Sequence, residues 1–109
     1  DGITPEEIDI VNFGHEKTSV RISIDKIGDG DVLISNNGNT FMVTGLKNGE
    51  SIYIDSGREI IQTDIINTYR YDNIVGDFDY LTLKKGTNNI VISGGACIIE
   101  FKYTYRYKL

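Results

Sequence analysis

The clearest pattern in the chain is the alternation of apolar and polar residues near its C-terminus. Between residues 97 and 108, one set of alternate positions is mostly polar, and the other carries Cys97, Ile99, Phe101, Tyr103, Tyr105 and Tyr107. The segment 19–25 has the same pattern, with apolar residues at Val20, Ile22 and Ile24. A period of two puts alternate side chains on opposite faces of a β-strand. Both segments therefore predict strands that have one face against a core.

Shorter apolar runs separated by turn residues fill the middle of the chain. They lie at 31–35, 40–46, 51–55 and 59–62. Asn37-Gly38 and Asn48-Gly49 predict tight turns, because Asn and Gly tolerate the positive φ angles that such turns need, and the first indicates a hairpin. Several short strands at this spacing are typical of a β-sandwich or a barrel.

Two segments depart from this simple alternation. In residues 6–13 the apolar phase slips between Ile10 and Val11, so we expect a first strand with a β-bulge at that point. The stretch 62–76 is short and rich in asparagine, although Ile61, Ile65 and Tyr69 would share one face of a helix. A helix, a single helical turn and an irregular connection all remain open for it.

Composition places the whole chain in the all-β class. Its 109 residues suffice for one domain with its own core. Alanine, the best helix former, occurs only at position 96, whereas β-branched and aromatic residues, including 7 tyrosines, are common. We therefore predict a single antiparallel β-sandwich domain spanning residues 1–109, with little or no helix.

Net charge and cysteine content exclude several functions. A formal net charge of -5 disfavours a general nucleic-acid or anionic-membrane binder, since long-range repulsion slows encounters with polyanions. Cys97 is the sole cysteine, which excludes an intrachain disulfide and a cysteine-rich zinc site. No apolar run approaches the roughly 18 residues of a membrane span, and no secretory signal opens the chain. Because the chain starts at Asp1 rather than Met, we expect a piece of a longer protein.

Candidate catalytic and metal-binding residues are few. His15 is the sole histidine, and no nucleophile or oxyanion motif accompanies it, so we interpret it as an exposed loop residue. Asp25, Asp29 and Asp31 surround two glycines and are the best candidates for a calcium site. We favour ordinary β-turns for them, because the spacing of a helix–loop–helix calcium site is absent. We predict no catalytic residue, cofactor or metal.

The aromatic residues allow two interpretations. We expect Phe101 and Tyr103 to pack on the inner face of a sheet. Tyr105 and Tyr107 could pack there too, or they could contact a protein or a host glycan, because tyrosine rings supply contact area at a small entropic cost. Three further tyrosines could belong to such a surface: Tyr69, Tyr71 and Tyr80.

Several short motifs stand out in the second half of the chain. They are a Gly-Asp-Phe start, a leucine segment with Gly and Asn, a Gly-Gly turn and a Tyr-Arg-rich last strand, at Gly76, Asp77, Phe78, Leu81, Leu83, Gly86, Asn88, Ile90, Gly94, Gly95, Tyr103 and Arg106. In these motifs the chain resembles the C-terminal domain of phage distal tail proteins, the siphophage tail-component family. It departs from the family at Asp79 and Lys85, where prolines are common, and at Thr104-Tyr105, which replaces the usual Arg-Pro.

These motifs are expected to be architectural. We expect Asp77 to cap a turn and the apolar residues Phe78, Leu81 and Leu83 to anchor a strand into the sandwich. Residues 84–89 would then form the next turn.

The resemblance implies a galectin-like β-sandwich of the jelly-roll type. In the family this domain is joined to an N-terminal domain that forms a hexameric ring and would be missing here. The resemblance brings no catalytic residues, and the tryptophan and His-Asn-Arg set of galectin sugar sites are not matched. We therefore expect a non-enzymatic virion protein of a phage or prophage tail tip, made in the bacterial host cytoplasm, that docks or spaces baseplate or receptor-binding proteins. The alternative is a carbohydrate-binding module that recognises host surface glycans through exposed tyrosines.

Overall fold

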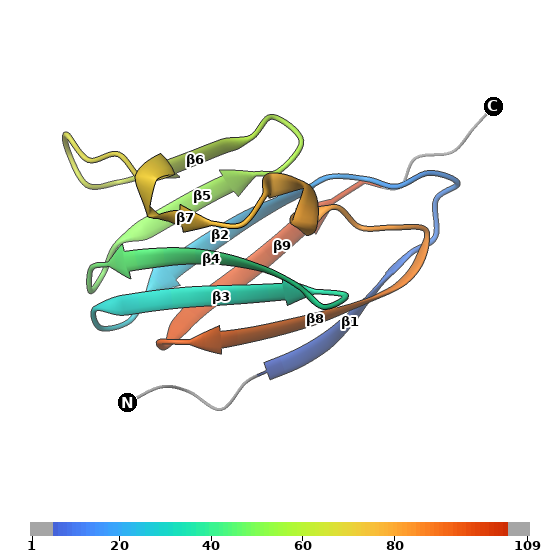
Figure 1. The fold of residues 1–109 in the computed structure, drawn as a ribbon, viewed down its shortest axis with the longest axis horizontal. Coiled ribbons are helices and arrows are strands. Elements are labelled where there is room, and N and C mark those ends of the chain that lie inside the picture. The colour runs from blue at the N-terminus through green and yellow to red at the C-terminus, as the bar shows by residue number, and fades with distance from the viewer. Residues whose placement is uncertain (1–5, 105–109) are drawn as a thin grey trace.

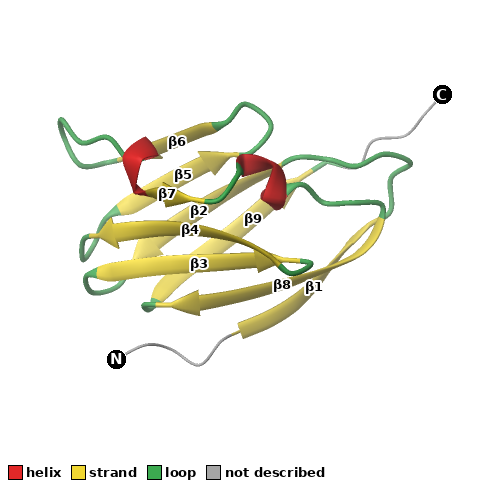
Figure 2. Cartoon of the chain, in the orientation of Figure 1, coloured by secondary structure: helices red, strands yellow, loops and turns green. Residues whose placement is uncertain are grey.

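The computed structural model describes residues 6–104, which fold into two antiparallel β-sheets packed as a sandwich (Figure 1). The strands are β1 (Glu6–Asn12), β2 (Val20–Lys26), β3 (Gly30–Asn36), β4 (Asn39–Leu46), β5 (Ser51–Asp55), β6 (Ile60–Thr63), β7 (Ile74–Val75), β8 (Gly86–Gly94) and β9 (Cys97–Tyr103). Two short 3-10 helices, drawn red in Figure 2, are η1 (Tyr71–Asn73) and η2 (Phe78–Leu81). The predicted all-β sandwich is confirmed.

Each sheet combines one pair of consecutive strands, β3–β4 or β5–β6, with strands that are distant in the sequence. One sheet has the order β1-β8-β3-β4-β7, and the other has the order β6-β5-β2-β9. β1 pairs with β8, and β2 pairs with β9, so both ends of the described chain are built into the sandwich (Figure 1). The fold therefore depends on pairing between segments that no local pattern connects.

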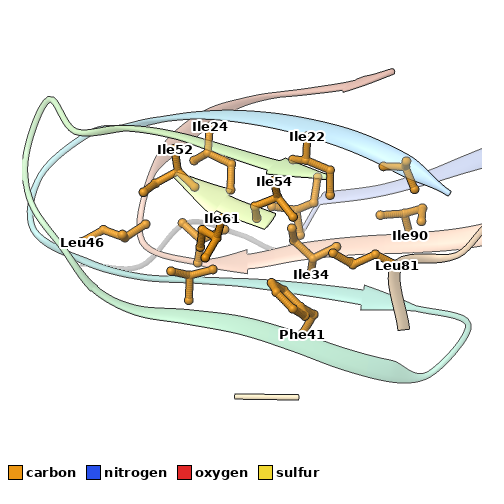
Figure 3. Close-up of a cluster of buried hydrophobic side chains, with 14 of the residues drawn as sticks. Ile22, Ile24, Ile34, Phe41, Leu46, Ile52, Ile54, Ile61, Leu81 and Ile90 are labelled. Atoms are coloured by element: carbon orange, nitrogen blue, oxygen red, sulfur yellow. The ribbon is translucent and has the colours of Figure 1, made fainter. Parts of the chain in front are cut away.

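Branched aliphatic side chains fill the space between the sheets. β2 alternates buried and exposed residues along its length, and β9 alternates half-buried and exposed ones, as a period of two predicts. The buried set includes Ile22, Ile24, Ile34, Phe41 and Ile54, which Figure 3 shows between the strands. Burial of apolar surface of this kind is the main stabilisation of a β-sandwich.

Both predicted Asn-Gly turns are present, but they connect different parts of the fold. Asn37 and Gly38 have φ angles of 51° and 90°, and they close the β3–β4 hairpin. Asn48-Gly49 joins β4 to β5, which belong to different sheets. The second turn therefore links the two layers of the sandwich and is not a hairpin.

The β-bulge expected between Ile10 and Val11 is wrong. The register of β1 on β8 has no shift, because Asn12 takes the next core-facing position after Ile10. Asn12 is buried, and its Nδ2 donates to the carbonyl oxygens of Glu16 at 3.0 Å and Leu83 at 3.2 Å. A buried polar residue with hydrogen-bond partners therefore continues the alternation that looked interrupted in the sequence.

The stretch 62–76 contains no α-helix. It holds the end of β6, an irregular loop, the single 3-10 turn η1 and the two-residue strand β7. Of the alternatives left open by the sequence, the structure therefore has an irregular connection that includes one helical turn. Within residues 6–104 no helix is long and apolar enough to cross a membrane.

The segment that begins the family motifs is a helical turn rather than the expected strand. Phe78 and Leu81 lie in η2, and the Asp77 carboxylate caps this helix by accepting a backbone N–H at 2.9 Å. Leu81 and Leu83 are buried. The turn expected to reach residue 89 ends earlier, because β8 already begins at Gly86.

Phe78 packs on the margin of the core. Its ring centroid lies 5.4 Å from that of the buried Phe41, and Phe78 itself is half-buried. We expect Phe78→Ala to lower the free energy of unfolding by about 2 kcal/mol, less than the roughly 3–5 kcal/mol expected for Phe41→Ala, because part of the Phe78 ring is already in water. Urea unfolding of both variants measures the difference. Equal losses would contradict the marginal position of Phe78.

Candidate functional site

The glycines of the family motifs occupy turns and close backbone approaches. Gly76 and Gly94 have φ angles of 113° and 94°, and a Cβ at either position would lie 2.7 Å from a backbone carbonyl oxygen of another strand. Only glycine fits such positions without displacing the backbone. Gly86 opens β8, and the N–H of Gly95 donates to the Asp31 carbonyl at 2.7 Å.

Gly95 also accommodates a buried lysine. Lys26 Nζ donates to the carbonyl oxygens of Ile27 and Ala96, each at 3.0 Å, and a Cβ on Gly95 would lie 2.6 Å from this Nζ. Cys97 lies opposite Lys26 in the β2–β9 pairing. Burial raises the pKa of the Cys97 thiol, and the positive charge of Lys26 partly offsets this effect.

Asn88 joins three segments of the fold. Its side chain is fully buried, and Nδ2 lies 3.3 Å from the carbonyl oxygen of Ile10, 2.9 Å from that of Lys84 and 3.1 Å from that of Gly86. Oδ1 accepts hydrogen bonds from the N–H of Lys84 at 2.9 Å and from Nδ2 of Asn37 at 3.0 Å. Asn88 therefore ties β1, the β3–β4 hairpin and the loop before β8 to one another.

The last strand carries aromatic residues that only partly enter the core. Phe101 and Tyr103 are half-buried and pack against the core side chains. Tyr105, Arg106 and Tyr107 lie outside the described residues, so their assignment as motif or contact residues stays a prediction.

The candidate metal ligands do not converge. Each carboxylate of Asp25, Asp29 and Asp31 accepts a hydrogen bond from a different residue, in that order Ser51, Asn48 and Gly45. Within residues 6–104, no group of three His, Cys, Asp or Glu side chains is placed to hold a metal ion. His15 is exposed in the β1–β2 connection, as the sequence predicted.

The most exposed large apolar side chains of the described residues lie in the loop between β6 and η1. Ile66 and Tyr69 are 85% and 76% exposed, and Tyr71, which begins η1, is 42% exposed. The rings of Tyr69 and Tyr71 lie 5.8 Å apart with an interplanar angle of 49°. The two tyrosines and β6 line an open groove of about 520 Å³. We call residues 64–71 the tyrosine loop.

A buried ion pair holds the base of the tyrosine loop. Arg70, which lies between the two tyrosines in sequence, donates from Nη2 to Glu50 Oε1 at 2.7 Å and from Nε to Glu50 Oε2 at 2.8 Å. The Glu50 side chain is fully buried, and its oxygens accept further hydrogen bonds from the N–H of Lys47 and the hydroxyl of Thr63. This two-pronged contact fixes the tyrosine loop to the β4–β5 turn.

Two opposing effects act on the carboxyl group of Glu50. Burial favours its neutral form and by itself would raise the pKa. The hydrogen bonds from Arg70, Thr63 and Lys47, together with the Arg70 charge, outweigh burial and hold the pKa of Glu50 below its ordinary value. The hydrogen bond to Glu50 in turn raises the pKa of Arg70, so the pair is fully ionised at neutral pH.

Sequence reasoning considered Tyr69 and Tyr71 but missed their supporting residues. Glu50 and Arg70 are 20 positions apart, and no local pattern connects them. No signal in the sequence pointed to Ile66, which lies outside the helical face that Ile61, Ile65 and Tyr69 would share. Tyr80, the third tyrosine considered, is 38% exposed and lies on η2, outside the tyrosine loop.

Comparisons with known proteins confirm the resemblance drawn from the motifs. The SPbeta prophage-derived uncharacterized protein YomH of Bacillus subtilis (strain 168) is 33% identical over 105 residues, and the chain spans only 40% of its length although the match covers 94% of this chain. No solved structure matches the chain. A family model described as Phage tail C-terminal domain matches residues 6–103. Because this match spans the described fold almost from end to end, the chain belongs to the phage tail C-terminal domain family.

Proposed function

We propose that this domain is a non-enzymatic structural module of a phage or prophage tail tip, and that residues 1–109 are the C-terminal domain of a distal tail protein. Family membership supports a structural role in the tail, and the prophage origin of the relative YomH is consistent with it. In this proposal the protein is made in the bacterial host cytoplasm and carried in the virion. It becomes hexameric only through the ring-forming domain that precedes it in the family.

The tyrosine loop is the observation that carries a docking role. Protein interfaces concentrate their binding free energy in a few aromatic and large apolar side chains on a rigid support. Ile66 and Tyr69 are mostly exposed, and the Glu50–Arg70 pair anchors the loop from the protein interior. The partner that fits this surface is another tail or baseplate protein, or a receptor-binding protein, with an apolar pocket.

Ile66→Ser tests this docking surface. We expect it to weaken binding to the neighbouring tail protein by about tenfold or more, because an exposed apolar anchor is lost from the interface. Thermal unfolding should not change, since the side chain is 85% exposed. Biolayer interferometry with purified baseplate and receptor-binding proteins of the same phage measures the affinity.

Ile98→Ser on β9 is the matched control, because it removes the same apolar side chain from a position that is 64% exposed and outside the tyrosine loop. If both variants lose affinity equally, the tyrosine loop is not the docking surface. If the unmodified domain binds none of the tail proteins, the docking role itself is contradicted.

Carbohydrate binding is the second candidate function. The Tyr69 and Tyr71 rings border a groove of about 520 Å³, a size typical of small-ligand sites, and tyrosine rings can stack on a sugar. Specific binding on a glycan array that is lost in Tyr69→Ala, or in Tyr105→Ala and Tyr107→Ala, would favour this candidate. The galectin-like relationship likewise remains a prediction, and galectin-type sugar recognition is not matched by the sequence.

A further inference from the structure

A second groove, of about 580 Å³, lies at the end of the β6-β5-β2-β9 sheet. It is bounded by the β5–β6 turn and by the end of β9, which Figure 1 shows on the same side of the molecule. Arg21 of β2 and Arg58 of the turn both line it, with Ser19, Tyr103 and the carboxylate of Asp55. We call it the arginine groove. Its size falls in the range of small-ligand sites.

The two guanidinium groups of the arginine groove have no ion-pair or hydrogen-bond partner among residues 6–104. Asp55 lies opposite Arg21 in the β2–β5 register, but its Oδ1 accepts the backbone N–H of Arg58 at 3.2 Å. Arg70, by contrast, is paired with a carboxylate in the protein interior. A guanidinium presents a planar fork of N–H donors that suits a carboxylate or a phosphate, so the two free forks favour an anionic ligand.

A third cation lies next to the arginine groove. Lys102 of β9 is directly opposite Arg21 in the sheet, and like charges in such cross-strand positions destabilise a sheet. Among residues 6–104, Lys102 has an ion pair only with the exposed Glu100, at 3.7 Å. In a chain with a net charge of -5, three basic side chains therefore lie at this end of the sheet beside the carboxylate of Asp55.

The opposite side of the β5–β6 turn limits the kind of anion that fits. Glu59, Asp77 and Asp79 line a hollow of about 340 Å³ that shares Gly57 with the arginine groove. A long polyanion that crossed the groove would meet these carboxylates and the overall negative charge of the chain. A small ligand with one anionic group would avoid that hollow, and within the groove it would meet the largely buried carboxylate of Asp55 beside the two arginines.

Polar and aromatic groups beside the two arginines suit a ligand that also carries hydroxyl groups. Gly57 lies next to the Ser19 hydroxyl, and a Cβ at position 57 would be 2.6 Å from the serine Oγ. Because glycine has no side chain, the Ser19 hydroxyl stays accessible from the groove. Tyr103 is half-buried and contributes to the wall of the groove. An aromatic wall with hydroxyl and guanidinium groups is a combination that binds acidic carbohydrates.

We propose that the arginine groove binds a small hydroxylated ligand with a single phosphate or carboxylate group, such as a phosphorylated or acidic sugar unit, held by Arg21 and Arg58. The anionic group lies between the two guanidinium forks, and the sugar hydroxyls contact the Ser19 side of the groove. This site is separate from the tyrosine loop and does not depend on the docking role proposed above.

Glucose 6-phosphate and glucuronate are the probes. Glucose, which lacks the anionic group, and inorganic phosphate, which lacks the sugar, are the matched controls. In a two-dimensional NMR titration we expect saturable binding of at least one probe, with a dissociation constant on the order of 1 mM. Amide shifts should cluster at Ser19, Arg21, Gly57 and Arg58. Arg21→Gln and Arg58→Gln should each weaken binding about fivefold, because each removes one charge-assisted contact.

Lys85→Gln is the charge-matched control, since Lys85 is exposed and lies outside the groove. Unchanged amide spectra away from the substituted positions show that the variants remain folded. Absence of saturable binding by both probes would overturn the proposal, as would equal weakening by Lys85→Gln. If inorganic phosphate bound as tightly as glucose 6-phosphate, the sugar would make no contribution and the proposed ligand class would be wrong. If the amide shifts were confined to the tyrosine loop, the arginine groove would not be the binding site.

Discussion

Replacing Glu50 by glutamine is expected to lower the free energy of unfolding by about 3–5 kcal/mol, because it leaves the buried Arg70 guanidinium without its counter-charge. Both Glu50 oxygens accept a hydrogen bond from Arg70, and an amide NH₂ in place of one oxygen would face donors. Urea unfolding followed by circular dichroism measures the loss.

Glu7→Gln is the control for this substitution, because Glu7 is exposed on β1 and an exposed substitution changes stability by no more than about 0.5 kcal/mol. The same experiment tests the support of the tyrosine loop. Amide hydrogens of residues 64–71 should exchange faster in Glu50→Gln than in the unmodified protein. If Glu50→Gln were as stable as Glu7→Gln, the ion pair would make no net contribution to the fold.

The Glu50–Arg70 pair also predicts how stability depends on pH. The pKa of Glu50 is lower in the folded protein than in the unfolded chain, so ionised Glu50 stabilises the fold most fully above the unfolded pKa of about 4.3. This contribution falls as the pH drops from that value through the lowered folded pKa. The stability difference between the unmodified protein and Glu50→Gln should therefore narrow below about pH 4.3. A difference that stayed constant down to pH 3 would contradict the lowered pKa.

Asn88→Ala is the second substitution expected to have a large effect. It removes the partners of three carbonyl oxygens and of two donors in a fully buried site. Each buried polar group left without a partner costs about 1–3 kcal/mol. We therefore expect the free energy of unfolding to fall by roughly 3 kcal/mol, even if water forms hydrogen bonds with some of these groups. Thermal and urea unfolding both measure this loss.

Asn89→Ala is the neighbouring control on the same strand. The Asn89 side chain is half-exposed, and Nδ2 donates to the exposed Asp9 carboxylate at 3.2 Å. Loss of this contact should change stability by less than about 1 kcal/mol, because water replaces the partner. Equal destabilisation by Asn88→Ala and Asn89→Ala would contradict the role of Asn88 as the residue that joins β1, the β3–β4 hairpin and the loop before β8.

Much of the secondary structure could be predicted because strand formation leaves a local signal. Alternation along residues 20–26 and 97–103 marks which side chains face the core, and the structure confirms both faces. The Asn37-Gly38 hairpin could be predicted for the same reason, because the positive φ angles of a tight turn favour Asn and Gly at these positions. The erroneous bulge at Ile10 came from the assumption that every core-facing residue is apolar, which the buried Asn12 violates.

The candidate sites were less predictable, because their members come from separate segments. The tyrosines of the tyrosine loop were visible in the sequence, but the residues that hold them were not. Arg21 and Arg58 are distant in sequence and meet in one groove only because the β5–β6 turn folds back beside β2. A charged residue in a strand or a turn is ordinarily a solvated one, so neither arginine was distinguishable from the sequence.

The sequence by itself determined the all-β class, the main strands, the tight turns and membership of the phage tail C-terminal domain family. These properties depend on residues that are near one another in the chain. They are the alternation of apolar and polar residues, the Asn-Gly pairs, and motif residues whose backbone angles or packing allow few other residue types. Only the tertiary structure decided which strands share a sheet, which polar groups are buried, and which charges are paired. Those properties depend on contacts between distant segments: Arg70 is paired with Glu50, whereas the guanidinium groups of Arg21 and Arg58 have no ion-pair or hydrogen-bond partner in the described part of the chain.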